Sequence, residues 1–182
     1  MNRIFAFILF LLLLPLILLL IIIIVVDDGF PFVYAQKRVG KNNSHFILYK
    51  FRTMKKHAPS VPSDEFNETG KYILKTGYII RKFSLDEILN LVNIIFGDLN
   101  FVGPRPALEN QTVLLSLRKK YGIDNLKPGL TGWAQINGRD IISTEQKIDY
   151  EKYYLEKKTI LLDTLILVKT IPYVLISKDV SH

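Results

Sequence analysis

The sequence has no cysteine and only three histidines among its 182 residues. Without cysteine, disulfide bonds, thiolate metal ligands and a cysteine nucleophile are excluded. His45, His57 and His182 lack the spacing of a zinc site. No Walker loop or dinucleotide-binding glycine pattern is present. The sequence therefore argues against zinc and P-loop chemistry.

Acidic residues are fewer than basic ones, 17 against 24, which leaves a formal net charge of +7. Such an excess favours contact with phosphates, nucleic acid or an anionic membrane surface, and a solvated basic face accounts for it equally well. The length suits one globular domain with a modest core plus a membrane segment.

Charge is absent from residues 4–26. As a straight helix this segment would be about 34 Å long, enough to span a bilayer core. Pro15 lies at its middle and predicts a kink near Leu14. A signal peptide is disfavoured by the length of the run. A straight span and a re-entrant hairpin both remain open, because hydropathy does not choose between them.

The remainder, residues 27–182, mixes short strand patterns with helical ones and predicts a mainly helical α+β domain. Residues 32–34 and 46–51 flank a turn-rich segment and predict a β-hairpin. Residues 57–70 contain prolines and serines and few apolar residues, which is typical of a surface loop.

Apolar periodicity predicts helices at residues 85–96, ending at Gly97, and at residues 111–121 and 143–158. Between the last two, residues 127–132 form a predicted turn-rich loop. Residues 159–177 are apolar but contain charges that disfavour a second span, so we expect helices that lie on the membrane surface or cover the core.

The first candidate for chemistry is the segment Ser84-Leu-Asp86-Glu87, at the start of a predicted helix. In the structural interpretation it is a capping box, with Ser84 as the cap and Glu87 reaching back. In the catalytic interpretation, the helix dipole lowers the pKa of Asp86 and keeps it ionised. Arg81 and Lys82 add positive charge that would let a phosphate approach this carboxylate.

Two further segments contain basic residues in a setting that could orient them. In one the backbone is restricted by prolines, and in the other basic and aromatic residues alternate. Arg105 lies between Pro104 and Pro106, which restrict its backbone, so its guanidinium could hold a phosphate with two hydrogen bonds. A rigid loop with a surface arginine explains the pattern equally well. Basic and aromatic residues alternate from Tyr49 to Met54, as in a phosphate pocket or an ordinary edge strand.

Together these segments resemble the bacterial sugar transferase family, the monotopic polyprenyl-phosphate phosphoglycosyl transferases that initiate glycan assembly. The motifs occur in the family's order and cover nearly the whole chain. They are Gln36-Lys-Arg38-Val-Gly40, Lys50-Phe-Arg52-Thr-Met54, Arg81-Lys-Phe-Ser-Leu-Asp86-Glu87, Gly97-Asp98, Val102-Gly-Pro-Arg105-Pro106 and Lys127-Pro-Gly-Leu-Thr-Gly-Trp-Ala-Gln-Ile-Asn-Gly-Arg139.

The resemblance implies a minimal, monotopic form of the family. Residues 1–26 would be a re-entrant membrane helix broken at Pro15, with both ends cytoplasmic. Residues 27–182 would be a membrane-associated catalytic domain with interfacial amphipathic helices, on the cytoplasmic face of the bacterial inner membrane. The resemblance thus favours the re-entrant hairpin over a straight span.

The resemblance also implies a reaction. A sugar 1-phosphate passes from a UDP-sugar to undecaprenyl phosphate, UMP is released, and Asp86 is the nucleophile that forms a covalent aspartyl phosphosugar. Glu87 assists the lipid phosphate step or the metal, and Mg²⁺ is expected at Asp86. The substrate-binding residues that the family's motifs imply are Arg105 and, with weaker correspondence, Lys50, Arg81, Arg139 and Asp149. After Pro106, the segment Ala-Leu-Glu-Asn departs from the Glu-Leu-Pro stretch of many members, which leaves substrate preference open.

Other functions and partners stay open at this point. A membrane-anchored binding module without enzymatic activity, recruiting glycan-assembly proteins, is the main alternative. Nucleic-acid binding has only charge and aromatic content in its favour, and we expect none. The sequence identifies neither the sugar nor the glycan pathway, and it leaves a homo-oligomer open.

Overall fold

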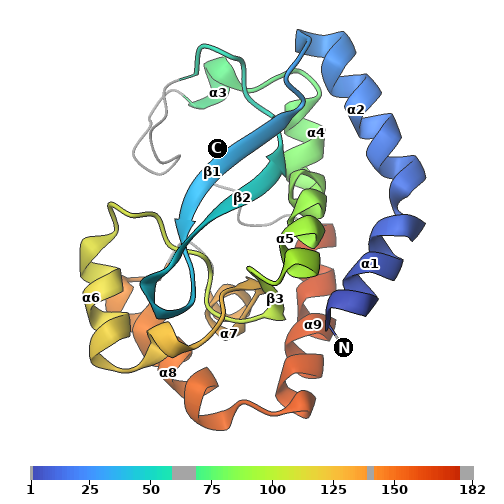
Figure 1. Cartoon of the computed structure of the whole chain (residues 1–182). Coiled ribbons are helices and arrows are strands. Elements are labelled where there is room, and N and C mark those ends of the chain that lie inside the picture. Colours follow the sequence, from blue (N-terminus) through green and yellow to red (C-terminus); the bar gives the residue numbers. More distant parts are fainter. Residues whose placement is uncertain (1, 59–68, 139–141, 177–182) are drawn as a thin grey trace.

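The computed structural model describes residues 2–58, 69–138 and 142–176 and has mainly helical α+β architecture (Figure 1). This confirms the predicted fold class. In chain order its elements are α1 (Asn2–Leu12), α2 (Leu14–Asp28), β1 (Val33–Val39), η1 (Lys41–Asn43), β2 (His45–Phe51), α3 (Thr69–Tyr72), α4 (Gly77–Lys82), η2 (Leu85–Leu89), α5 (Asn90–Phe96), β3 (Asn100–Val102), α6 (Thr112–Lys120), η3 (Ile123–Asn125), β4 (Gly129–Thr131), α7 (Trp133–Asn137), α8 (Thr144–Lys157) and α9 (Ile160–Ile176), where η denotes a 3₁₀ helix.

The apolar segment forms two helices, α1 and α2, that meet at an angle of 60° (Figure 1). The break lies at Leu13, and Pro15 follows it in the first turn of α2, where a missing backbone N–H costs no helical hydrogen bond. The kink predicted near Leu14 is therefore confirmed. Among the described helices, none is by itself long and apolar enough to cross a membrane, and only the bent pair passes that test together.

The first of these helices packs back onto the globular part of the chain. α1 packs against α5. Ala6 of α1 is fully buried against leucines and an isoleucine of the globular part. The guanidinium of Arg3 lies against Gly97, since a Cβ added at Gly97 would be 2.0 Å from the Nη2 atom of Arg3. Gly97 ends α5 with a φ of 92°, as predicted, and a cation is favourable at this end of a helix.

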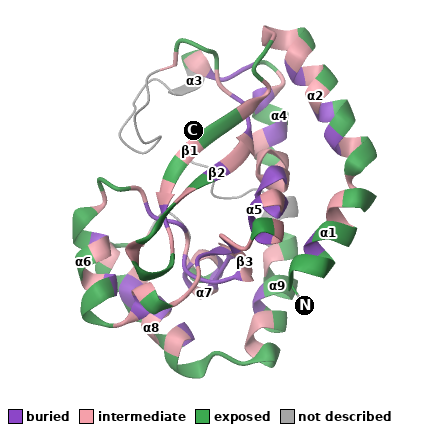
Figure 2. Cartoon of the chain, viewed as in Figure 1, coloured by how far each residue is buried: buried purple, intermediate pink, exposed green. Residues whose placement is uncertain are grey.

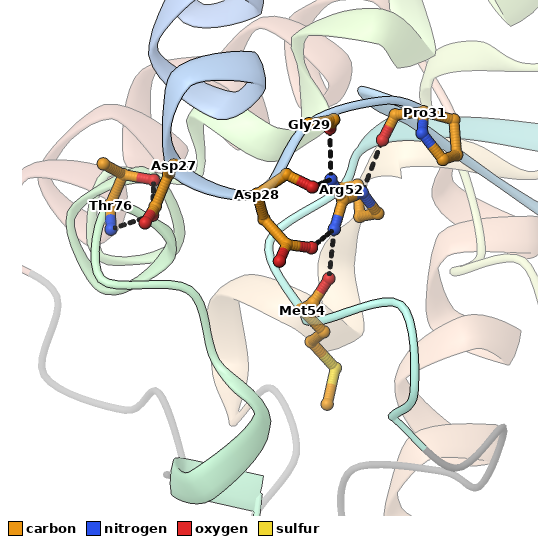
Figure 3. A network of polar contacts seen from close by, with 7 residues as sticks. All are labelled: Asp27, Asp28, Gly29, Pro31, Arg52, Met54 and Thr76. Carbon is orange, nitrogen blue, oxygen red and sulfur yellow. Dashed lines mark hydrogen bonds and ion pairs between the residues drawn. The ribbon is translucent and has the colours of Figure 1, made fainter.

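The end of α2 is held by a buried arginine, Arg52 (Figure 3). Arg52 donates hydrogen bonds to the carboxylate of Asp28 and to the backbone carbonyls of Gly29, Pro31 and Met54. The last carbonyls of a helix lack partners within the helix, and the guanidinium satisfies groups at this exit. Both ends of the bent pair therefore contact the same globular unit.

Beside this exit, Asp27 accepts hydrogen bonds from the backbone N–H and the hydroxyl of Thr76, at 3.0 and 2.7 Å (Figure 3). The backbone hydrogen bond is the main reason that the pKa of Asp27 is lowered. Thr76 directly precedes α4, so this contact ties α2 to the element that leads into η2.

The predicted hairpin is confirmed, with a longer first strand than expected. β1 and β2 pair antiparallel from Val33 opposite Phe51 to Val39 opposite His45. β2 packs on η2 and α5, and this contact brings the hairpin to the Asp86-Glu87 segment. Most of the predicted loop at 57–70 lies outside the described residues, because residues 59–68 are not described.

The predicted helix at residues 85–96 is two elements, η2 and α5, and the predicted capping box at its start is wrong. Ser84 has a φ of 52°, in the left-handed region, and its side chain makes no capping hydrogen bond. Its backbone is used instead: its N–H bonds to the carbonyl of Arg81, and its carbonyl accepts from the N–H of Glu87. A residue in the left-handed region cannot have the extended backbone of an N-cap, so the capping geometry is lost between α4 and η2. A capping box is found at α8, between Ser143 and Gln146.

In the C-terminal half, α6 and α8 confirm the predicted helices to within one residue. Residues 127–132 are only partly the predicted loop, because β4 forms there and pairs parallel with β3. The two strands approach closely, since a Cβ added at Gly129 would lie 2.1 Å from the nitrogen of Gly103. No side chain fits at this crossing.

The last described helix, α9, is one helix rather than several, with Pro172 inside it. Its buried side reaches the core through Ile166, which packs with Val102 and Tyr154. Many residues of α1, α2 and α9 are exposed (Figure 2), and large apolar residues are among them. They include Ile4, Phe7, Leu12, Leu18, Ile22, Val26, Leu161, Val168 and Ile171.

Candidate active site

The carboxylates of the site come from η2. Asp86 and Glu87 are partly buried there, and η2 packs against β2 and α4. The pKa of Asp86 is raised from 3.8 to about 6, mainly by burial and then by the negative charge of Glu87, while Lys50 and Arg81 act in the opposite direction. The predicted lowering of this pKa is wrong. Burial and a like charge outweigh the dipole of a five-residue 3₁₀ segment.

Two predicted cations converge on Glu87. The Nζ atom of Lys50, from β2, lies 2.7 Å from Glu87 Oε1, and Nη2 of Arg105 lies 3.7 Å from the same oxygen. Arg81, in the last turn of α4, is near enough to Asp86 to act on its pKa. The structure therefore brings together five of the seven predicted site residues.

The other two predicted residues are not part of this group. Asp149 is exposed on α8, and α8 packs mainly on α6, α7 and η3. Arg139 lies outside the described residues.

The backbone around Arg105 is held at three successive carbonyls. The carbonyl of Pro104 accepts from the N–H of Gly129 at 2.9 Å, that of Arg105 from Arg118 at 3.0 Å, and that of Pro106 from Arg38 at 3.1 Å. Proline restriction alone suggested a fixed direction for Arg105. The structure adds three hydrogen bonds from three separate elements that hold the loop.

Arg118 is itself fixed by a buried ion pair. It bonds both carboxylate oxygens of Glu151, with Nε to Oε2 at 2.8 Å and Nη2 to Oε1 at 2.5 Å. Both side chains are almost completely buried. α6 and α8 thus support the Arg105 loop from behind.

Glu87 and the two cations beside it, Lys50 and Arg105, line a pocket of about 290 Å³, counted with the open solvent at its mouth. Charged side chains of Arg38, Lys50, Glu87 and Arg105 line it together with Asn90 and apolar residues. Sequence reasoning missed Arg38 and Asn90 as site residues. Arg38 lies in a motif of the family resemblance, and Asn90 lies three residues after Glu87, where a helix places it on the same face.

Arg38 is an unusual cation. Its pKa is lowered from 12.5 to about 10, mainly by burial and then by the neighbouring charge of Arg105. Two guanidinium groups beside one another are favourable when an anion lies between them. The pocket is thus suited to phosphate groups.

The carboxylate pair also fits a hard cation. Among the described residues, no group of three or more His, Cys, Asp or Glu side chains is placed to bind a metal. Mg²⁺ usually binds one or two carboxylates and completes its shell with water and substrate phosphates. Asp86 and Glu87 match that partial ligand set.

Comparison with known proteins agrees with this chemistry. The family model described as bacterial sugar transferase matches residues 1–177. The chain is 40% identical over 160 residues to the uncharacterized sugar transferase EpsL of Bacillus subtilis, covering 85% of this chain and 75% of that protein.

Two longer relatives have more specific names. The chain is 32% identical over 152 residues to the UDP-N-acetylgalactosamine-undecaprenyl-phosphate N-acetylgalactosaminephosphotransferase of Aeromonas hydrophila, covering 80% of this chain and 36% of that protein. It is 32% identical over 163 residues to the undecaprenyl-phosphate galactose phosphotransferase of Salmonella typhimurium, covering 81% and 34%. The similarity thus spans about a third of each of these two proteins.

Proposed function

The chain belongs to the bacterial sugar transferase family, and on that premise we propose that it transfers a sugar 1-phosphate from a UDP-sugar to undecaprenyl phosphate, as a first step of glycan assembly. One observation carries the proposal. Asp86, a carboxylate with a pKa of about 6, directly precedes Glu87, which lines a pocket together with Arg38, Lys50 and Arg105. Relatives named for transfer of sugar phosphates to undecaprenyl phosphate support the choice of substrates.

In the first step, a carboxylate oxygen of ionised Asp86 attacks the phosphorus that bears the sugar. The new bond joins Asp86 to phosphorus, the bond from phosphorus to the bridging oxygen breaks, and UMP leaves with that electron pair. Arg38 and Arg105 would bind the diphosphate oxygens and stabilise charge on the leaving group. The product is a covalent aspartyl phosphosugar.

In the second step, a phosphate oxygen of undecaprenyl phosphate attacks the same phosphorus. The bond to Asp86 breaks, the carboxylate is regenerated, and a polyprenyl diphosphate sugar is released. One site thus serves a soluble donor and a lipid acceptor in turn.

Two groups would assist the transfer. Glu87 is bound by Lys50 and keeps that cation beside Asp86. Bound Mg²⁺, held by Asp86 and Glu87, would neutralise charge on the phosphates.

A re-entrant arrangement of α1 and α2 at the cytoplasmic face of the bacterial inner membrane belongs to the same proposal. It is supported by the bend of 60° and by the contacts of both ends with one globular unit, Arg3 at Gly97 and Asp28 at Arg52. Exposed apolar side chains on α1, α2 and α9 supply a surface that would bury itself in lipid.

The reaction is tested on the purified full chain. It is incubated with Mg²⁺ and a panel of UDP-sugars, and intact mass then reports a phosphosugar adduct on Asp86 while a coupled assay reports UMP. Asp86→Asn should fold and give neither signal. Glu109→Gln, which changes an exposed carboxylate, is the matched control and should give both. Full turnover by Asp86→Asn would refute the mechanism, and no UMP from the wild type with any donor would favour a binding module instead.

The membrane arrangement is tested with cysteines introduced singly near each end of the chain, in intact cells. Both should be protected from an impermeant thiol reagent. Labelling of one end only would show that the ends lie on opposite sides of the membrane and would refute the re-entrant arrangement.

A further inference from the structure

One buried polar atom in the pocket has no use in the steps above. Asn90 is 3% exposed and lines the pocket. Its Oδ1 atom has no hydrogen-bond partner within the part of the chain that the structure describes. A buried carbonyl oxygen without a partner is unfavourable, so native proteins seldom keep one without a reason.

A second buried asparagine on the same helix shows the contrast. Asn93 accepts a hydrogen bond from the N–H of Tyr49 and donates to the carbonyl of Ile47 and to Asp98. The fold therefore uses Asn93 completely to join α5 to β2. Asn90, one turn earlier, has no such task.

Two basic side chains that line the pocket with Asn90 form hydrogen bonds with other groups. Lys50 bonds to Glu87, and Arg38 bonds to Gln36 and to the carbonyl of Pro106. Asn90 thus lines the pocket with an oxygen to which neither of these two side chains donates.

The surroundings restrict what could bond to this oxygen. A fully ionised phosphate has no hydrogen to donate, and an ammonium group would be repelled by the three basic side chains of the pocket, Arg38, Lys50 and Arg105. Leu48 and Leu99, both buried, line the pocket with Asn90. The fitting group is therefore uncharged, has an N–H or O–H donor, and is flanked by apolar surface.

The pocket places Asn90 among the residues proposed to bind the diphosphate. Arg38 and Arg105 line it together with Asn90. A group of the donor substrate close to its diphosphate is therefore the one within reach of this side chain.

We propose that Asn90 is a specificity-determining residue, whose Oδ1 atom accepts a hydrogen bond from an uncharged N–H or O–H group of the donor substrate next to its diphosphate. The inference rests on the proposed function. Three parts of a UDP-sugar offer this chemistry: a hydroxyl or amide N–H on the sugar ring, the hydroxyls of the ribose, and the imide N–H of uracil.

The test compares three full-length proteins, the wild type, Asn90→Leu and Asn90→Asp. Leucine has nearly the same size and no acceptor, while aspartate keeps both the shape and the acceptor. Asn110→Leu, at an exposed position, is the matched control. kcat/KM for UMP or CMP release is measured with UDP-glucose, UDP-galactose, their N-acetylated amino counterparts and a cytidine diphosphate sugar.

We expect Asn90→Leu to lose about tenfold or more in kcat/KM for the preferred donor, the range of a lost hydrogen bond in a site built for it. If the hydrogen-bond partner of Asn90 is on the sugar, the kcat/KM values for the different uridine donors become more similar to one another. If it is on the base, kcat/KM falls by one factor for all uridine donors and the preference for uridine over cytidine narrows. If it is on the ribose, kcat/KM falls by one factor for the uridine and cytidine donors alike and that preference stays. Asn90→Asp should keep the wild-type ratios, because a lower rate from its added charge affects all donors alike.

Stability separates this role from a structural one. Asn90→Leu should raise Tm because it removes an unpaired buried oxygen, whereas Asn93→Leu should lower it. Unchanged kcat/KM and unchanged ratios in Asn90→Leu would overturn the inference while the proposed function stands, and loss of the ratios in Asn90→Asp would overturn the role of the acceptor. Absence of turnover by the wild type would overturn the proposed function, and this inference with it.

Discussion

Replacing Asp86 by asparagine should abolish turnover and at the same time stabilise the folded protein. The side chain keeps its size and loses its charge. In the wild type that charge is disfavoured by burial and by Glu87, which together raise the pKa of Asp86 from 3.8 to about 6. An acid with a higher pKa in the folded protein than in the unfolded one binds its proton more tightly when folded. Folding is therefore penalised once the pH is high enough to remove that proton.

The size of the effect follows from the two pKa values. Between 3.8 and 6 the difference corresponds to about 3 kcal/mol, and the full penalty applies above about pH 7. It shrinks to about 1 kcal/mol near pH 4.5, where the folded protein already holds the proton, and it vanishes as the pH falls below 3.8. For a chain of this length, about 3 kcal/mol corresponds to a rise in Tm of roughly 6–12 °C.

The assay is thermal unfolding of wild type and Asp86→Asn in one detergent, at about pH 8 and about pH 4.5. UMP release is measured on the same preparations. The variant should unfold at a clearly higher temperature than the wild type at the higher pH, and the gain should be much smaller at the lower pH. A variant that is equally or less stable at the higher pH would refute the conclusion that folding disfavours the ionised form of Asp86. A gain in stability that does not depend on pH would refute it as well.

Three further changes test the surroundings of the site. Glu87→Gln should lower the pH midpoint of turnover in the pH–rate profile, because the charge of Glu87 helps to raise the pKa of Asp86. A midpoint that stays in place or rises would contradict this. Glu151→Ala leaves Arg118 buried without its partner and should cost about 3–5 kcal/mol in the free energy of unfolding, measured with urea; a cost under about 1 kcal/mol would show that the pair is solvated. Gly129→Ala places a Cβ 2.1 Å from a backbone nitrogen of the neighbouring chain segment and should lower Tm and turnover together, whereas an unchanged Tm would mean that the strands can separate.

Much of the fold could be predicted because it depends on local rules. Proline position predicted the bend between α1 and α2, and apolar periodicity predicted α6 and α8 to within one residue. β-branched and aromatic runs around a turn predicted the hairpin. Each of these signals acts over a few neighbouring residues, so the rest of the chain is not needed to read it.

The errors at the site have a common cause. Ser84 matches a capping pattern, but its backbone is in the left-handed region at the junction of α4 and η2. The pKa of Asp86 was expected to fall from a local helix dipole, and it rises because other elements bury it. The sequence does not predict a role for Asn90, because the lack of a hydrogen-bond partner for its Oδ1 atom depends on the positions of all its neighbours.

The sequence by itself determined the residue types of the site and the local elements that carry them, because motif spacing and periodicity are properties of the chain. Only the tertiary structure decided the electrostatics. Lys50 from β2, Arg105 from the loop after β3 and Arg38 from β1 meet at Glu87 and the pocket through long-range packing. Burial and distance set the strength of a charge interaction, and neither quantity exists until the chain is folded.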